Sequence, residues 1–377
     1  AYHLLAARED AEVDLILRES LVLIDPMENP DGRARFVHEN RIAQSRWPDP
    51  DPLSAEHNEP WPGGRANHYL FDLNRDYTAQ TQLETQGKVR VYREWMPHIV
   101  ADLHEMSGNS TYFFPPTAPP ENSLFGDRQI QQMDLFGADI ADAFDERGFA
   151  YFNRDTYDLF YPGYVDMWPM THGSLGMTFE QASPRALVLR RSDGDLLTYG
   201  DGVIHHFTAA VQTMVTAARN RRRILQDHLE FRRDGARGSD RGPAEFVLTG
   251  SDPGMVERLA RNLVLNGVEV FEASREVRIG DRTVPADDTY IVPLSQPASP
   301  MARMLLENEV PMDEDFLRRQ EELRANRQPS EIYDVTAWSP ALLWDVEVLH
   351  ASRATGALGP PVTTPAEKSG KTLPPAR

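Results

Sequence analysis

The chain has 377 residues, of which 40% are hydrophobic and 9% aromatic, a composition typical of a globular protein long enough for two domains. Its formal net charge of −19 argues against a nucleic-acid partner, because phosphate binding requires a basic face. Cysteine is absent, which excludes a disulfide framework, a thiolate zinc site and a thiol nucleophile.

The first residues have the spacing of an amphipathic helix. Tyr2, Leu5 and Ala6 fall on one face of a helix over residues 1–17, and no capping residue precedes them. We therefore expect the chain to be a fragment, or a mature form, that begins in or just before a helix. No apolar run approaches the roughly 20 residues of a membrane span, so none is predicted, and export of the parent protein stays open.

Strand and helix patterns alternate through residues 1–233, the predicted first domain. Short apolar runs predict strands at 20–25, 69–74, 98–104, 149–153 and 173–180. Longer runs with helical spacing predict helices at 81–97, 124–147 and 202–233. Predicted loops are 27–40, with a turn at Asn29-Pro30-Asp31-Gly32, the Pro- and Gly-rich 44–66, and the tyrosine-rich 157–170. This order predicts an α/β fold with a mixed central sheet flanked by helices.

A polar, glycine-rich stretch at residues 234–244 predicts a linker. A second, smaller α/β domain is predicted over residues 245–350, with strands at 245–248, 268–271 and 288–294 and helices at 253–266, 299–308 and 313–326. Residues 351–377 are rich in Pro, Thr, Gly and Lys and are predicted to be a disordered tail.

Two predicted strands of the first domain end in side chains that suit hydrolytic chemistry. His104 ends the apolar run that begins at residue 99, and Glu180 ends the apolar run that begins at residue 173. A side chain at the end of a buried strand is held rigidly, and its tip faces the rim of the sheet, where ligands bind in open α/β folds. An imidazole and a carboxylate placed there can hold a metal ion and activate water.

Residues 1–230 resemble the zinc metallocarboxypeptidases, the carboxypeptidase A-like family. The resemblance rests on five segments in the family's order: 29–32 (NPDG), 72–76 (DLNRD), 102–105 (DLHE), 157–164 and 176–180 (GMTFE). Each segment is weak alone, and the ordered set carries the resemblance. It implies a zinc-dependent exopeptidase that binds one Zn²⁺ ion and removes C-terminal residues, so peptide and protein C-termini are the expected partners.

The resemblance also implies roles for individual residues. His104 is expected to be the last zinc ligand, and Glu180 to take a proton from water and pass it to the leaving amine. Asn74 and Arg75 are expected to bind the terminal carboxylate of the substrate, since a guanidinium matches a carboxylate with two parallel hydrogen bonds. The ordinary alternatives are a core histidine, a solvated glutamate, and a surface ion pair between Arg75 and a neighbouring aspartate.

Two further roles stay ambiguous. The phenol that closes over the substrate in this family is expected to come from Tyr161 or Tyr164, and spacing does not choose between the tyrosines of residues 157–164. The candidates for the arginine that polarises the scissile carbonyl are Arg41, a slightly later position near Gln44 and Arg46, and Arg65.

The family's first two zinc ligands form a His-x-x-Glu motif, and none of the 11 histidines here has Glu three positions later. By resemblance the motif belongs about a dozen residues before Ala1, in an enzyme clipped at its N-terminus; a complete, metal-free descendant is the alternative. With two ligands absent, the chain is predicted to bind zinc weakly and to have little peptidase activity. Adjacent His205 and His206 point about 100° apart on a helix and are interpreted as packing and capping residues. The basic run 219–223 is interpreted as a solvated helix end.

Residues 245–350 resemble, more loosely, the auxiliary domain, similar to the class I glutamine amidotransferase fold, that follows the peptidase domain in some bacterial members. The likeness rests on the strand-helix-strand order and on residues 333–338 (YDVTAW). Glutamine hydrolysis of that class needs a nucleophilic cysteine and is excluded. The leading hypothesis is thus a metallocarboxypeptidase, with trimming of cell-wall peptides as one variant. The alternative is a non-catalytic module that binds peptide carboxylates with Asn74 and Arg75.

Overall fold

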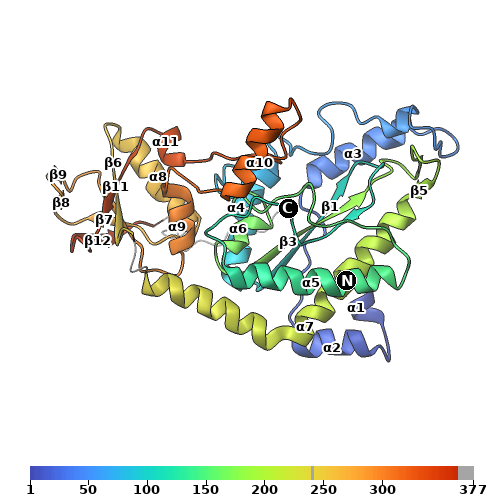
Figure 1. Ribbon diagram of the computed structural model, residues 1–377, viewed down its shortest axis with the longest axis horizontal. Coiled ribbons are helices and arrows are strands. Elements are labelled where there is room, and N and C mark those ends of the chain that lie inside the picture. Colours follow the sequence, from blue (N-terminus) through green and yellow to red (C-terminus); the bar gives the residue numbers. More distant parts are fainter. Residues whose placement is uncertain (239–241, 364–377) are drawn as a thin grey trace, which may run out of the picture.

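The computed structural model describes residues 1–238 and 242–363, and it is an α/β protein as predicted. Figure 1 shows two separate groups of strands with helices packed around each. Up to residue 238 the elements are α1 (Tyr2–Ala6), α2 (Ala11–Glu19), α3 (Pro30–Ala43), η1 (Ala55–His57), η2 (Leu73–Arg75), α4 (Leu83–Trp95), β1 (Ile99–Met106), β2 (Tyr112–Phe113), α5 (Asp127–Asp145), α6 (Met167–Met170), β3 (Leu175–Ala182), β4 (Val188–Arg190), β5 (Leu196–Thr198) and α7 (Tyr199–Arg237).

From residue 242 onward the elements are β6 (Glu245–Thr249), α8 (Pro253–Leu265), β7 (Phe271–Ala273), β8 (Val277–Ile279), β9 (Arg282–Val284), β10 (Tyr290–Pro293), α9 (Ser299–Leu306), α10 (Glu314–Ala325), α11 (Pro340–Leu343), β11 (Glu347–Ala351) and β12 (Leu358–Pro361). No helix in the described ranges combines the length and the apolar composition needed to cross a bilayer.

The sheet of the first half is mixed, as predicted. Its strand order is β1-β3-β2, in which β1 and β3 are parallel and β2 is antiparallel to β3. Helices α5, α6 and α7 contact β3, and a core rich in aromatic side chains fills the space between them. The backbone before α6 lies directly on the strand at Gly176, where a Cβ atom would come within 1.6 Å of Asp166 O. Only glycine leaves room for that contact.

The second half contains a five-stranded sheet of order β11-β6-β10-β7-β12, and all its pairings are antiparallel. Strand β12 pairs with β7, so the prediction of a disordered tail from residue 351 is wrong for residues 351–361. Pro360 and Pro361 lie on the last strand of the sheet, where a missing N–H is tolerated. Residues 364–377 lie outside the described residues.

The two halves share one apolar core. Tyr77, Val89 and Trp168 of the first half belong to the same cluster of buried side chains as the apolar face of α8 and the strands β6 and β10. Asn266, which is fully buried at the end of α8, accepts hydrogen bonds from Gln80 Nε2 (3.1 Å) and Trp168 Nε1 (2.8 Å). Its own Nδ2 donates to Thr78 O at 2.8 Å. This contact therefore joins the halves by polar as well as apolar groups.

Several predicted elements of the first half are wrong. Residues 27–40 form most of helix α3 rather than a loop, because Asn29 caps the helix by accepting from Gly32 N (3.0 Å) and Pro30 occupies its first turn. The predicted strand 69–74 is folded into turns, since Asn67 Oδ1 accepts from the N–H groups of Tyr69 and Phe71 (both 3.0 Å).

Other boundaries also differ from the predictions. The helix predicted over residues 1–17 is interrupted by Asp10, whose side chain caps α2. Residues 20–25 are irregular, and residues 149–153 contribute only one bridge, between Phe152 and Phe113. The predicted linker 234–244 is wrong at its start because α7 continues through Arg237, and its residues 239–241 lie outside the described residues.

Candidate active site

His104 and Glu180 lie opposite each other on adjacent parallel strands. In the register of β1 and β3, His104 pairs with Glu180 and Asp102 pairs with Thr178. Because side chains two residues apart on a strand share a face, these four side chains project from the same face of the sheet. Asp102 and Glu180 are 6% and 8% exposed, so two carboxylates and an imidazole are gathered in a mostly dry place.

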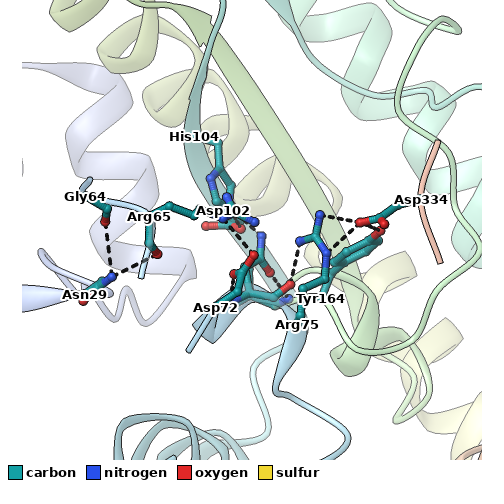
Figure 2. Close-up of polar contacts among 11 residues, drawn as sticks. Asn29, Gly64, Arg65, Asp72, Arg75, Asp102, His104, Tyr164 and Asp334 are labelled. Carbon is teal, nitrogen blue, oxygen red and sulfur yellow. Dashed lines mark hydrogen bonds and ion pairs between the residues drawn. The ribbon is translucent and has the colours of Figure 1, made fainter. Parts of the chain in front are cut away.

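The His104 ring is held by two neighbours. Its Nε2 lies 2.5 Å from Asp102 Oδ2 and 3.0 Å from Asn74 Nδ2, and Figure 2 shows the ring directed at Asp102. From behind the strand, His206 Nε2 bonds the main-chain oxygen of His104 at 3.0 Å. The imidazole is therefore fixed through both its ring and its backbone.

Burial and charge shift the acidity of both groups. Burial raises the pKa of Glu180 to about 7, although the neighbouring His104 charge opposes the shift. Burial alone would lower the pKa of His104, but the adjacent Asp102 and the charge of Glu180 outweigh it and raise the pKa to about 9. Glu180 Oε2 is buried and has no hydrogen-bond partner among the described residues. A carboxyl group with a pKa near neutrality is suited to both accepting and donating a proton.

Asn74 and Arg75 sit on the short helix η2, which is fixed at both ends by aspartates. Asp72 Oδ1 accepts from Asn74 N (2.9 Å). Buried Asp76 accepts from Thr81 N, Thr81 Oγ1 and Gln82 N at 2.7–2.9 Å. The Asn74 side chain is already engaged, since its Oδ1 accepts from Val165 N (2.8 Å) while its Nδ2 contacts His104. It therefore connects the helix to the histidine.

Arg75 holds a carboxylate that comes from the second half of the chain. Its Nε and Nη2 lie 2.7 Å and 2.6 Å from Asp334 Oδ2, and its Nη1 donates to Asn74 O at 2.8 Å. The guanidinium carbon lies 4.2 Å from the centre of the Tyr164 ring, and Tyr164 Oη donates to the same Asp334 oxygen at 3.0 Å. Figure 2 shows the three side chains converging. Arg75 is therefore paired with the distant Asp334 and not with a neighbouring aspartate, which was the alternative.

The two predicted tyrosines are buried and support the arginine. Tyr161 Oη donates to Arg75 O at 3.1 Å, and Tyr164 packs on and around the guanidinium as described. Burial first, and the charge of Glu180 next, raise the pKa values of three phenols, Tyr112, Tyr157 and Tyr333. The rings of Tyr157 and Tyr333 lie 5.3 Å apart, so two of these phenols, one from the predicted loop and one from the second half, are neighbours, whereas Tyr112 lies on β2.

The candidate arginines differ in where they lie relative to Glu180 and His104. Arg41 is exposed on α3, where it lines a cavity together with Arg33 and His38. Arg65 pairs with Asp72 (Nε–Oδ2 2.9 Å), and its positive charge acts on both Glu180 and His104. The structure thus brings Arg65 to the site. Arg46 stacks instead on exposed Trp47, 5.6 Å from the ring centre.

The donor set at the site does not by itself make a zinc centre. Within residues 1–238 and 242–363, no three His, Asp or Glu side chains are arranged to hold one metal ion. Nε2 of His104 is engaged by Asp102 and Asn74. His205 and His206 contact different partners, Gln181 Oε1 and the His104 backbone, so they do not form a metal pair. Zinc at His104 would require ligands that these ranges do not supply.

We compared the chain with protein-family models, with curated proteins and with solved structures, and none of the three comparisons found a match.

The supporting residues were harder to predict than the central ones. Asp102 lies two residues before His104 in the same strand, so strand periodicity alone places it on the same face. Asp334 and Tyr333 reach the site from a segment more than 250 residues away from Arg75, and no local pattern indicates that contact. The His206 ring packs against Tyr112, as the packing interpretation predicts, and it also bonds the main-chain oxygen of His104.

Proposed function

We propose that this chain is a carboxypeptidase-type hydrolase that binds the C-terminal carboxylate of a peptide at Arg75 and cleaves the neighbouring peptide bond with Glu180. The observation that supports this proposal is the pairing of His104 with Glu180 in one register, with Asn74 of η2 in contact with His104 Nε2. Through that contact, the carboxylate-binding arginine and the proton-transferring glutamate belong to one connected site.

In this proposal each group has a task that its surroundings suit. Glu180 takes a proton from the water that attacks the scissile carbonyl, and it returns a proton to the leaving amine. Its pKa of about 7 lets both forms exist near neutral pH. Arg65, whose charge reaches Glu180, is the arginine that we assign to the developing oxyanion. Among the described residues, His104 is the one residue that we assign as a ligand of the predicted zinc ion.

A second candidate is a non-catalytic module that binds peptide carboxylates. One observation favours it: the described residues form no three-donor metal group, and Asp102 and Asn74 already engage His104 Nε2. Under this alternative, Arg75 and Tyr164 recognise a chain end, and no bond is broken.

The test is peptide hydrolysis by the purified chain in excess zinc, with a peptide that carries a free C-terminus and the same peptide amidated. We expect slow release of the last residue from the free acid only. Glu180→Gln should lower the rate by about 100-fold or more, as expected for loss of a general base. Glu245→Gln is the matched control, because Glu245 is also buried (4% exposed, against 8% for Glu180) but lies on β6 in the second half.

The outcomes separate the two candidates. Hydrolysis that survives Glu180→Gln removes Glu180 from its role and contradicts the proposal. Binding of the free-acid peptide without any hydrolysis in zinc favours the non-catalytic module. Calorimetric titration of zinc adds an independent check, since tight one-to-one binding would mean that other residues complete the metal site.

A further inference from the structure

The segment between α10 and α11 lies across the carboxylate-binding end of the candidate site. Residues 328–339 have no regular secondary structure, and most of their side chains are exposed. The segment is attached at both ends: Glu331 bonds Arg319 on α10 at 3.1 Å, and Trp338 Nε1 donates to Met304 O on α9 at 2.8 Å. Between these points, Tyr333 and Asp334 reach the tyrosine-rich loop of the first half.

Asp334 makes the contacts that a substrate's terminal carboxylate would make. One oxygen, Oδ2, lies within 3.0 Å of three donors: Arg75 Nε, Arg75 Nη2 and Tyr164 Oη. Charged hydrogen bonds of this kind are the strongest ordinary contacts that a carboxylate makes in a protein. A second carboxylate on the same guanidinium would be repelled by the first, so Arg75 cannot serve both at full strength.

We propose that Asp334 is an internal competitor, whose carboxylate occupies the substrate-carboxylate position on Arg75 until a peptide C-terminus displaces it. This inference rests on the proposed role of Arg75 as the carboxylate-binding residue. Because the competitor is tethered, it acts at a high effective concentration, and only ligands that replace its bonds bind well. Asp334 lies in chain without regular secondary structure, so its carboxylate can leave Arg75 without unfolding a helix or a strand.

The test measures binding rather than catalysis. A fluorescent peptide with a free C-terminus, and the same peptide amidated, are titrated by anisotropy into the wild-type chain and into Asp334→Asn, a variant of nearly the same shape. We expect Asp334→Asn to bind the free acid about 10-fold more tightly than the wild type does. A change in affinity of about 10-fold is what the loss of one competing hydrogen bond to a charged group corresponds to. Affinity for the amide should not change.

Three further variants make the result specific. Asp315→Asn removes another exposed aspartate that is ion-paired with an arginine, Arg318 on α10, and it should leave both affinities unchanged. Adding Arg75→Gln to Asp334→Asn should abolish the gain. Asp334→Ala repeats the measurement without the amide group of asparagine.

Several results would overturn the inference. If the wild type and Asp334→Asn bind the free acid with equal affinity, Asp334 does not compete with the peptide. If Asp334→Asn binds the amidated peptide more tightly by the same factor as the free acid, the segment only blocks access. Weaker binding by Asp334→Asn would make Asp334 a positioning residue for Arg75. Hydrolysis of the free acid with an unchanged KM in Asp334→Asn overturns this inference alone, whereas an acid-specific gain in binding without hydrolysis overturns only the hydrolase.

Discussion

Asn266 offers the most direct test of how the two halves are joined. Its side chain is fully buried and accepts from Trp168 Nε1 and Gln80 Nε2, which are themselves 0% and 3% exposed. In Asn266→Ala both donors lose their acceptor, whereas Thr78 O keeps a bond from Asn262 Nδ2 at 3.0 Å. At about 1–3 kcal/mol for each buried unsatisfied group, the free energy of unfolding should fall by about 2–6 kcal/mol.

Asn326 provides a matched control. Both asparagines follow the last residue of a helix, α8 or α10, and each donates from Nδ2 to the carbonyl four residues earlier, at 2.9 Å and 3.0 Å. Asn326 is exposed, so Asn326→Ala removes the capping bond without leaving buried donors and should cost less than about 1 kcal/mol.

The measurement is urea unfolding followed by tryptophan fluorescence, with the two variants compared in one buffer. A loss for Asn266→Ala that matches the loss for Asn326→Ala would refute the reasoning. It would mean that water or a shift of neighbouring groups satisfies Trp168 and Gln80, and that the interface does not depend on this amide.

Three further predictions follow from buried or crowded positions. Burial lowers the pKa of His172 to about 4, so as the pH falls from about 6.5 to 4 the unfolded chain binds a proton at this residue before the folded chain does. The free energy of unfolding should therefore decrease across that range. Urea unfolding at pH 7 and at pH 4.5 should show that His172→Gln removes up to about 3 kcal/mol of this decrease. An unchanged pH dependence would contradict this. Asp76→Ala loses three hydrogen bonds under η2 and should cost about 2–4 kcal/mol by thermal unfolding, unlike exposed Asp193→Ala. Gly176→Ala should destabilise by about 1–3 kcal/mol because of the contact with the preceding loop, whereas Gly87→Ala, with open space on α4, should stabilise by about 0.5–1 kcal/mol. Equal melting temperatures for these two glycine variants would refute the packing argument.

The elements predicted correctly are those whose signal is local. Helix α5 and strands β1 and β3 each have an apolar pattern that their own packing uses. Because the two strands are parallel neighbours, residues at matching positions meet, and His104 and Glu180 lie opposite each other, each two residues before the end of its strand. The mixed sheet and the α/β class follow from the same patterns.

The errors have two physical sources. At residues 69–74 the apolar run predicts a strand, but the single side chain of Asn67 bonds two main-chain N–H groups and folds the run. At Asn29 the signal was present, since an asparagine before a proline is a common helix start. The contact of Arg75 with Asp334 joins residues 259 positions apart, and no periodicity within either segment could indicate it.

Helix α7 limits how the two halves can move. It has 39 residues, which at 1.5 Å per residue is about 58 Å of helix along its course, and Figure 1 shows it changing direction midway as it runs from β5 past α2 toward the second half. It contacts α2, α5 and β3 in one half and α9 in the other, and at Gly235 it lies too close to the backbone of Gln296 to accept a larger side chain without a shift. Because one continuous helix contacts both halves, spin labels on α5 and α8 should keep a constant separation when a peptide binds, while labels on residues 328–339 report the movement of that segment.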